Sequence, residues 1–501
     1  MTEVRDREIF PRSVVPGGMQ SASVKGSFAT MLSQGLKMAL QFGTQLVLAR
    51  ILFPADFGLL AMIAPIIAVV MIINDLGFGQ VVVQRASIYQ LQMSNLFWVN
   101  LAMGTTLGAL IIAAAPLAAY LYGEPRVLGL TSVMALMIPL GTLGILPNAF
   151  LTRKMRFVSI AKIDVGAALM GSAATVAASL LGMSYWSLVF GQLVSTLTAV
   201  STAWLLSGWK PSWPTRSISV RAEFAFGRNV TGTNLANVLS KSADNLLIGY
   251  VEGPVQLGFY DRSYRLLVQP LSQLLLPINR VAVPLLSSLS QDAAAFRKTY
   301  LFMVQLLVVA TVPGLLVCVA DGATVIRFLM SSRWEPATPI FAWFCVGGMT
   351  SALFSSASWI FISRNRTGAM LKYWVTASGI NLTACIIGIY WGAVGVAAVA
   401  SLSFIFIQTP LVLSGALKEG PVNFRDIFGV IATPTLAAAI TFAAVRFGLF
   451  AKAPSDLVTL LLEVGLSYGL LVLLLACTGH GRAFLLQTRK ALRKAIHPSE
   501  R

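Results

Sequence analysis

Apolar runs of about twenty residues, separated by short polar stretches, fill most of this 501-residue chain. A helix needs roughly 20 apolar residues to cross the hydrocarbon core of a bilayer. The pattern therefore predicts an all-α integral membrane protein with fourteen transmembrane helices. We expect these helices at residues 28–50, 57–80, 95–122, 127–151, 158–181, 185–207, 227–250, 261–284, 299–320, 339–363, 370–390, 392–415, 427–448 and 457–477.

The order of apolar runs and polar stretches divides the chain into six segments. A basic stretch rich in turn-forming residues, "GWKPSWPTRSISVRAE", separates two sets of six helices. The last segment alternates apolar and basic residues, which is typical of a helix lying on the inner leaflet. The predicted segments are a disordered cytoplasmic tail (1–24), a first lobe (25–207), a cytoplasmic linker (208–226), a second lobe (227–415), two further membrane helices (416–478) and a basic amphipathic cytoplasmic tail (479–501).

The positive residues alternate between the predicted loops in a way that fixes the orientation. Of 37 lysines and arginines, 27 fall on one side of the membrane, 8 on the other, and Lys37 and Lys241 inside helices. Basic residues accumulate in cytoplasmic loops, so this split predicts that both termini lie in the cytoplasm. The same reasoning explains the net charge of +18 without a nucleic-acid partner.

Corresponding residues recur in the two predicted lobes at nearly constant offsets. Because they recur in the same order and in matching loops, they indicate a duplicated six-helix unit. Each unit has an even number of helices, so the repeat is parallel, and transport sites tend to lie where such repeats meet. The matches are Pro54 with Pro254 and Gly58 with Gly258 (offset 200), Lys154 with Arg364, Arg156 with Arg366 and Lys162 with Lys372 (offset 210), and Tyr185-Trp186 with Tyr390-Trp391 (offset 205).

Each lobe begins with a helix that carries a polar stripe. Spacings of 3, 4 and 3 residues place each stripe on one helical face. A lysine at bilayer depth is costly and usually functional. A seam of interhelical hydrogen bonds would explain the amides, whereas the lysines favour the wall of a central, water-filled cavity. Lys37 has no acidic residue one turn away, and Asp244 follows Lys241 by three residues. The stripes comprise Gln34, Lys37, Gln41 and Thr44, and Asn234, Asn237, Lys241 and Asp244.

The residue types that carry most enzyme chemistry are sparse. The four cysteines fall in apolar runs without a CxxC pair, and the two histidines, His480 and His497, lie in the C-terminal tail. A metal centre is therefore not expected. The predicted outer loops are short, so a membrane enzyme such as a polysaccharide polymerase or ligase is disfavoured. We expect no catalytic residue, no metal ligand and no cofactor.

Three stretches, taken in order, resemble a known family. "ILFPADFGLLAMI", "NDLGFGQVVVQR" and "FLTRKMRFVSIAKID" are similar to segments of polysaccharide flippases of the multidrug/oligosaccharidyl-lipid/polysaccharide exporter superfamily. The closest branch is the Wzx-type, exopolysaccharide-exporting one. The resemblance covers residues 25 to about 420, and the last two helices match more loosely.

The resemblance implies two six-helix lobes around a central cavity and transport by alternating access. The substrate would be an oligosaccharide repeat unit linked to undecaprenyl pyrophosphate, moved across the bacterial inner membrane for exopolysaccharide or lipopolysaccharide biosynthesis. Lysines in a cavity suit its anionic pyrophosphate, and Asn and Gln suit sugar hydroxyls. Membrane lipids, a polymerase and chain-length proteins are the implied partners. Coupling to a proton or sodium gradient is left open.

Charged residues near the helix ends are further candidates for gating or ion coupling. Asp75 and Arg280 each follow an Ile-Asn pair, at an offset of 205, and would form an inner gate or anchor the helices at the interface. Arg262 and Arg265 would attract the departing pyrophosphate or serve as ordinary outer-loop charges. Asp164 is expected to be solvated or to pair with Lys162.

Two other transport functions remain open within the superfamily. A multidrug/cation antiporter would require an acidic cavity, but Asp244 is the only acid on the two stripes, against two lysines. A lipid II flippase would share the fourteen helices and the cationic cavity. The sequence pattern favours the exopolysaccharide branch.

Overall fold

The protein is helical almost throughout. The computed structural model describes the backbone of residues 8–10, 19–75, 77–84, 88–215, 221–418, 420–447 and 455–496, and the side chains of 30–75, 77–83, 88–215, 242–418, 420–447, 455–479 and 481–490. The helices are α1 (Met19–Ile51), α2 (Pro54–Asp75), α3 (Phe78–Gln84), α4 (Gln90–Tyr122), α5 (Arg126–Arg153), α6 (Phe157–Leu180), α7 (Trp186–Ser207), α8 (Arg221–Ser288), α9 (Ala293–Ala320), α10 (Gly322–Leu329), η1 (Ser332–Ala337), α11 (Thr338–Gly348), α12 (Ser351–Ser363), α13 (Thr367–Gly388), η2 (Ile389–Trp391), α14 (Gly392–Ser403), the π-helical η3 (Phe404–Gln408), α15 (Thr409–Leu417), α16 (Phe424–Arg446), α17 (Asp456–Cys477) and α18 (Gly479–Ile496).

Eleven helical stretches within the described part of the chain are long and apolar enough to cross a membrane. The predicted class, an all-α multi-pass membrane protein, is therefore confirmed. Ser242–Ser288 spans 47 residues. At 1.5 Å per residue that is about 70 Å of helix, more than twice the roughly 30 Å of a bilayer core. A break at Gly253, where φ is 76°, divides α8. The lead helix α1 is not among the eleven, because polar residues interrupt its apolar run.

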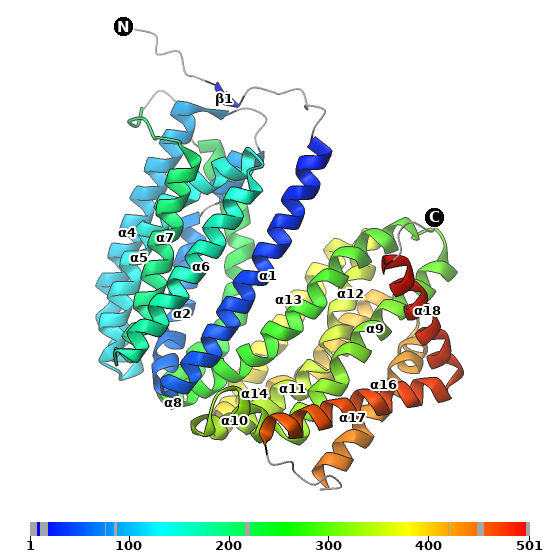
Figure 1. The fold of residues 1–501 in the computed structure, drawn as a ribbon. Helices are drawn as coiled ribbons and strands as arrows, with labels where there is room; N and C mark the ends of the chain where they lie inside the picture. The colour runs from blue at the N-terminus through cyan, green and yellow to red at the C-terminus, as the bar shows by residue number, and fades with distance from the viewer. Residues whose placement is uncertain are drawn as a thin grey trace. The chain divides into compact units, whose positions relative to one another are not determined.

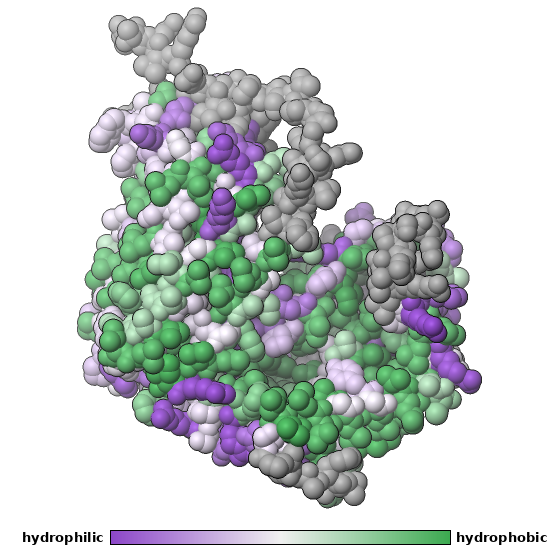
Figure 2. All heavy atoms as spheres, in the orientation of Figure 1, coloured by the Kyte–Doolittle hydropathy of each residue, from purple (hydrophilic) through white to green (hydrophobic). Residues whose placement is uncertain are grey.

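The chain folds into two compact units, residues 1–258 and 259–501. In the first unit α4, α5, α6 and α7 run side by side, and α1 packs along α6 (Figure 1). Hydrophobic side chains cover much of the flank of this bundle (Figure 2), as a lipid-facing surface requires. Leu181 and Leu205, for example, expose more than four fifths of their surface.

The second unit is built from a separate set of helix pairs. There α9 packs against α16, α13 against α14, and α16 against α17. Its core includes the fully buried Trp359 and Tyr300. These two rings lie 6.2 Å apart in an edge-to-face arrangement.

Two turns, one in each unit, share an unusual backbone. α5 ends at Arg153, Met155 has φ 52°, and α6 begins at Phe157. α12 ends at Ser363, Asn365 has φ 55°, and α13 begins at Thr367. The residue after each left-handed position donates its N–H to the carbonyl oxygen five residues earlier. The two turns lie 210 residues apart, at the offset found in the sequence.

Two helix starts cross at a contact that only glycine permits. A Cβ added at Gly58 would overlap the carbonyl group of Pro254. A Cβ added at Gly258 would overlap the carbonyl group of Pro54. The contact is reciprocal between segments 200 residues apart, as in an interface related by a two-fold axis.

The N-terminal segment differs from the prediction. The N-terminal tail was predicted to be disordered to residue 24, but β1 (Glu8–Phe10) pairs antiparallel with β2 (Ile88–Tyr89), and α1 already begins at Met19. Both the pairing of β1 with β2 and the early start of α1 depend on backbone hydrogen bonds, which composition alone does not reveal.

The predicted linker 208–226 is not a free connection over its described part. Its beginning lies along α4, where the backbone N–H of Ser212 donates to Ser94 and Thr215 exchanges two hydrogen bonds with the Asn95 amide. Its end is helical, because α8 starts at Arg221. Polar side chains at the start of α4 hold this segment in place.

Candidate functional site

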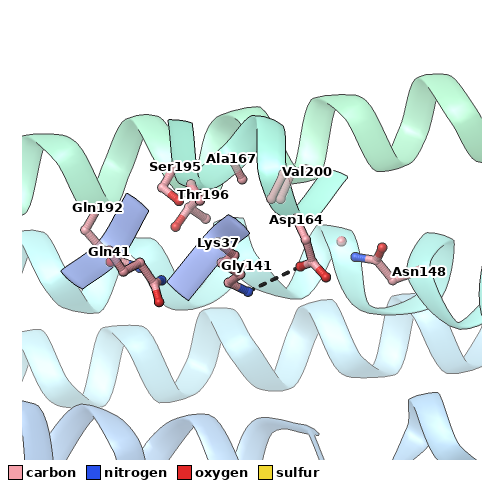
Figure 3. A pocket seen from close by; sticks show the side chains of 13 residues that line it. Lys37, Gln41, Gly141, Asn148, Asp164, Ala167, Gln192, Ser195, Thr196 and Val200 are labelled. Carbon is pink, nitrogen blue, oxygen red and sulfur yellow. Dashed lines mark hydrogen bonds and ion pairs between the residues drawn. The ribbon is translucent and has the colours of Figure 1, made fainter. Parts of the chain in front are cut away.

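A polar cavity of about 320 Å³ opens inside the first unit, between α1, α5, α6 and α7. Figure 3 shows Lys37 in direct contact with Asp164, with Gln41 and Gln192 toward one end and Asn148 near Asp164. Of the described residues that line it, Lys37 and Asp164 are the charged ones. The lining comprises Lys37, Gln41, Gly141, Gly144, Asn148, Asp164, Ala167, Ala168, Gln192, Ser195, Thr196, Ala199 and Val200.

Lys37 pairs with an acid from another helix. Its Nζ lies 3.3 Å from Asp164 Oδ1 of α6, and each side chain keeps about a third of its surface exposed (33% and 28%). Asp164 is partly solvated, as one alternative of the prediction had it, but its basic partner is Lys37 rather than Lys162. Partly exposed pairs of this kind contribute only about 0–1 kcal/mol to stability. The ion pair thus neutralises the partly buried lysine without fixing it in one position.

The other polar residues of the first stripe lie partly at the cavity and partly away from it. Gln34 Nε2 donates to Asp164 Oδ2 at 3.3 Å, and Gln41 lines the cavity. Thr44, by contrast, donates to the Leu40 carbonyl of its own helix. The predicted polar face of α1 therefore points toward α6 over its central turns.

A second cavity of about 360 Å³ adjoins the first through Asn148, which lines both. It lies at the end of α2, where Asp75 faces Gln80 and Thr152. The neighbouring Asn74 is buried and donates to Thr142 Oγ1 at 2.7 Å. Asp75 therefore borders a cavity.

The second polar stripe lies largely beyond the described side chains. Asn234, Asn237 and Lys241 belong to the described backbone of α8, but their side chains fall outside the described residues. Asp244 Oδ1 accepts a hydrogen bond from the N–H of Asn245. The predicted contribution of this stripe stays a prediction.

The arginines proposed for the outer side have different surroundings. Arg262 exposes only 13% of its side chain and pairs at 3.2 Å with the buried Asp261. Arg265 donates to the same carboxylate at 2.9 Å. An ordinary outer-loop charge would be solvated, so this interpretation of Arg262 was wrong. Arg280 is exposed.

The cavity contains polar residues that the sequence analysis did not single out. Asn148 comes from α5, and Gln192, Ser195 and Thr196 come from α7. A signal existed in α7, because Gln192, Ser195, Thr196 and Ala199 follow the i, i+3, i+4, i+7 spacing of one helical face. Asp164 gave no such signal, since its partner is 127 residues away.

Comparison with known proteins identifies related sequences. Residues 47–339 match the family model described as "Polysaccharide biosynthesis protein". The lipopolysaccharide biosynthesis protein WzxC of Escherichia coli is 22% identical over 397 residues, covering 78% of this chain and 79% of the relative. The succinoglycan biosynthesis transport protein ExoT of Rhizobium meliloti is 24% identical over 424 residues, covering 83% and 85%.

Solved structures share the fold at low sequence identity. The lipid II flippase MurJ in an inward closed conformation superposes with a TM-score of 0.70 at 15% identity, covering 89% of this chain and 98% of that one. An inward-facing multidrug MATE transporter reaches a TM-score of 0.55 at 12% identity, covering 82% and 96%. These likenesses concern the fold alone.

Proposed function

The chain belongs to the polysaccharide biosynthesis protein family, and from this premise we propose that it translocates oligosaccharide repeat units linked to undecaprenyl pyrophosphate across the bacterial inner membrane. It does so by alternating access and without a chemical step. Its product serves exopolysaccharide or lipopolysaccharide assembly, with membrane lipids around it and a polymerase and chain-length proteins downstream.

The observation that carries this proposal is Lys37 inside a polar cavity of a membrane helix bundle. An ammonium in a partly desolvated cavity attracts an anionic headgroup strongly. Gln41, Asn148 and Gln192 supply amides that suit phosphate or sugar oxygens. About 320 Å³ is at the small end of ligand pockets, so the cavity suits a headgroup rather than a whole oligosaccharide.

The layout that we propose has fourteen membrane helices, two six-helix lobes and both termini in the cytoplasm. The charge asymmetry of the loops supports the orientation. The matched turns at Met155 and Asn365, and the reciprocal contact of Gly58 and Gly258, support the duplication. Lys241, Asn234 and Asn237 would complete the substrate site from the second lobe, with Asp244, while Asp75, Arg280, Arg262 and Arg265 are gating candidates.

Transport by purified protein in liposomes tests the proposal. We expect translocation of an undecaprenyl-pyrophosphate-linked oligosaccharide, and its loss in a Lys37→Ala protein that inserts normally. The exposed Lys162→Ala is the matched control and should transport like the wild type. Transport of lipid II alone, or of organic cations alone, would replace the proposal with one of the other two superfamily functions.

A further inference from the structure

Asp164 is positioned to compete with any anion that Lys37 binds. The Lys37 ammonium and the Asp164 carboxylate lie 3.3 Å apart on the same cavity wall, and no other charged side chain appears among the described lining residues. An anion that approaches Lys37 is repelled by Asp164 at close range. The Lys37 ammonium therefore cannot interact fully with the anion and with the Asp164 carboxylate at the same time.

The surroundings of Asp164 allow it to release Lys37 and stay in place. Gln34 lies one turn before Lys37 and donates to the other carboxylate oxygen, Oδ2, at 3.3 Å. When Lys37 turns to an anion, Asp164 keeps this amide partner and its contact with water. Both charged side chains are about one-third exposed, so the exchange does not leave a fully buried charge unpaired.

The fold itself does not require a polar cavity here. At the offset of 210 residues, the position matching Asp164 in the second unit is Trp374, whose ring lies 5.2 Å from that of Phe354. Phe354 in turn matches Gly144, which lines the cavity. At these matching positions, the first unit has a cavity lined by an acidic side chain, whereas the second unit has a packed aromatic pair.

We propose that Asp164 is the residue that drives release: it reclaims Lys37 from the substrate's pyrophosphate and so expels the headgroup after translocation. This inference rests on the proposed function, in which Lys37 binds that pyrophosphate. Asp164 is a positioning residue, because it acts on the substrate through Lys37. Without substrate, Asp164 holds Lys37 toward the cavity. With the pyrophosphate bound to Lys37, Asp164 weakens that binding.

Binding of undecaprenyl pyrophosphate to the full-length protein in lipid nanodiscs tests this role. Asp164→Asn removes the charge and keeps the shape. We expect it to bind the probe about two- to fivefold more tightly, the range that a partly exposed ion pair is worth, and to release it more slowly. Turnover in liposomes should fall in step with the slower release. Asp164→Glu keeps the charge and should restore release toward the wild-type rate.

A double variant separates this role from a structural one. Lys37→Gln should weaken binding, and adding Asp164→Asn to Lys37→Gln should tighten it by less than Asp164→Asn does in the wild type, because the competition for Lys37 is then gone and only the direct repulsion is relieved. If Asp164→Asn folds poorly, Asp164→Ser gives the same comparison. Unchanged or weaker binding by the Asp164 variants, while Lys37→Gln loses binding, would overturn the release role and leave the proposed function standing. Unchanged binding by Lys37→Gln would overturn the proposed function itself.

Discussion

The two units pack the side chains at one set of matching positions in opposite ways. In the first unit, Gly144, Asp164 and Ala199 line a polar cavity. The matching positions in the second unit, at the offsets of 210 and 205, are Phe354, Trp374 and Phe404. Phe354 lies 5.2 Å from Trp374 and 4.9 Å from Phe404, ring centre to ring centre, so three aromatic side chains fill the place.

This difference separates what the fold needs from what the function needs. The turns at Met155 and Asn365 and the crossing of Gly58 with Gly258 are alike in both halves of the proposed repeat, which is expected of parts that set the architecture. Among the described residues, the cavity-lining positions of one half are matched by packed aromatic side chains in the other, which is expected of a part that binds a ligand.

Filling the cavity in the manner of the second unit should abolish transport. Asp164→Trp places the matching aromatic side chain in the cavity and removes the partner of Lys37. We expect translocation in liposomes to fall to background while the protein still inserts. Leu169→Trp is the matched control, because Leu169 lies exposed on the same helix. Normal transport by Asp164→Trp would contradict a binding role for the cavity.

Adding a methyl group at either side of the glycine crossing should destabilise the protein to a similar extent. Gly58→Ala and Gly258→Ala each drive a Cβ into a proline carbonyl of the other segment. Because backbone rather than a flexible side chain blocks the space, we expect a loss of about 3 kcal/mol, the upper end of overpacking costs. Thermal unfolding in detergent measures it. Gly35→Ala, with nothing near its added Cβ, should unfold like the wild type.

Removing the aromatic filling of the second unit should cost stability but not transport. Trp374 is partly buried against Phe354. We expect Trp374→Ala to lose about 2 kcal/mol, less than the roughly 3–5 kcal/mol of a fully buried tryptophan. Thermal unfolding and the transport rate per inserted molecule are to be measured together. A specific loss of transport at unchanged stability would mean that the second unit also carries a ligand site at this place.

The smallest expected effect on thermal stability concerns the two turns with a left-handed residue, at Met155 and Asn365. Met155 occupies a left-handed conformation (φ 52°) that costs a side chain about 1 kcal/mol, whereas the matching Asn365 (φ 55°) adopts it readily. Met155→Gly should therefore raise the midpoint of thermal unfolding slightly, and Asn365→Gly should raise it less. Met155→Val, which introduces a β-branched residue, should lower it. Equal shifts from the two glycine variants would contradict the assigned strain.

The sequence predicted those features that depend on local pattern. Apolar runs located the helices because a bilayer core imposes a minimum length, and spacing placed Lys37 and Gln41 on one face. The pairing of Lys37 with Asp164 depends on how α1 packs against α6, which is tertiary information. Arg262 was misassigned because its burial depends on how the helices pack around it, which the sequence alone does not reveal.

The affinity of the purified protein for undecaprenyl pyrophosphate in nanodiscs measures directly whether Lys37 binds the headgroup. We expect Lys37→Gln to weaken binding by about tenfold to a hundredfold, since a hydrogen bond to a charged group is worth roughly 1.5–3 kcal/mol. Trp374→Ala, at the matching position of the second unit, should bind like the wild type. Wild-type affinity in the Lys37→Gln protein would contradict the claim that the cavity of the first unit holds the substrate's anionic headgroup.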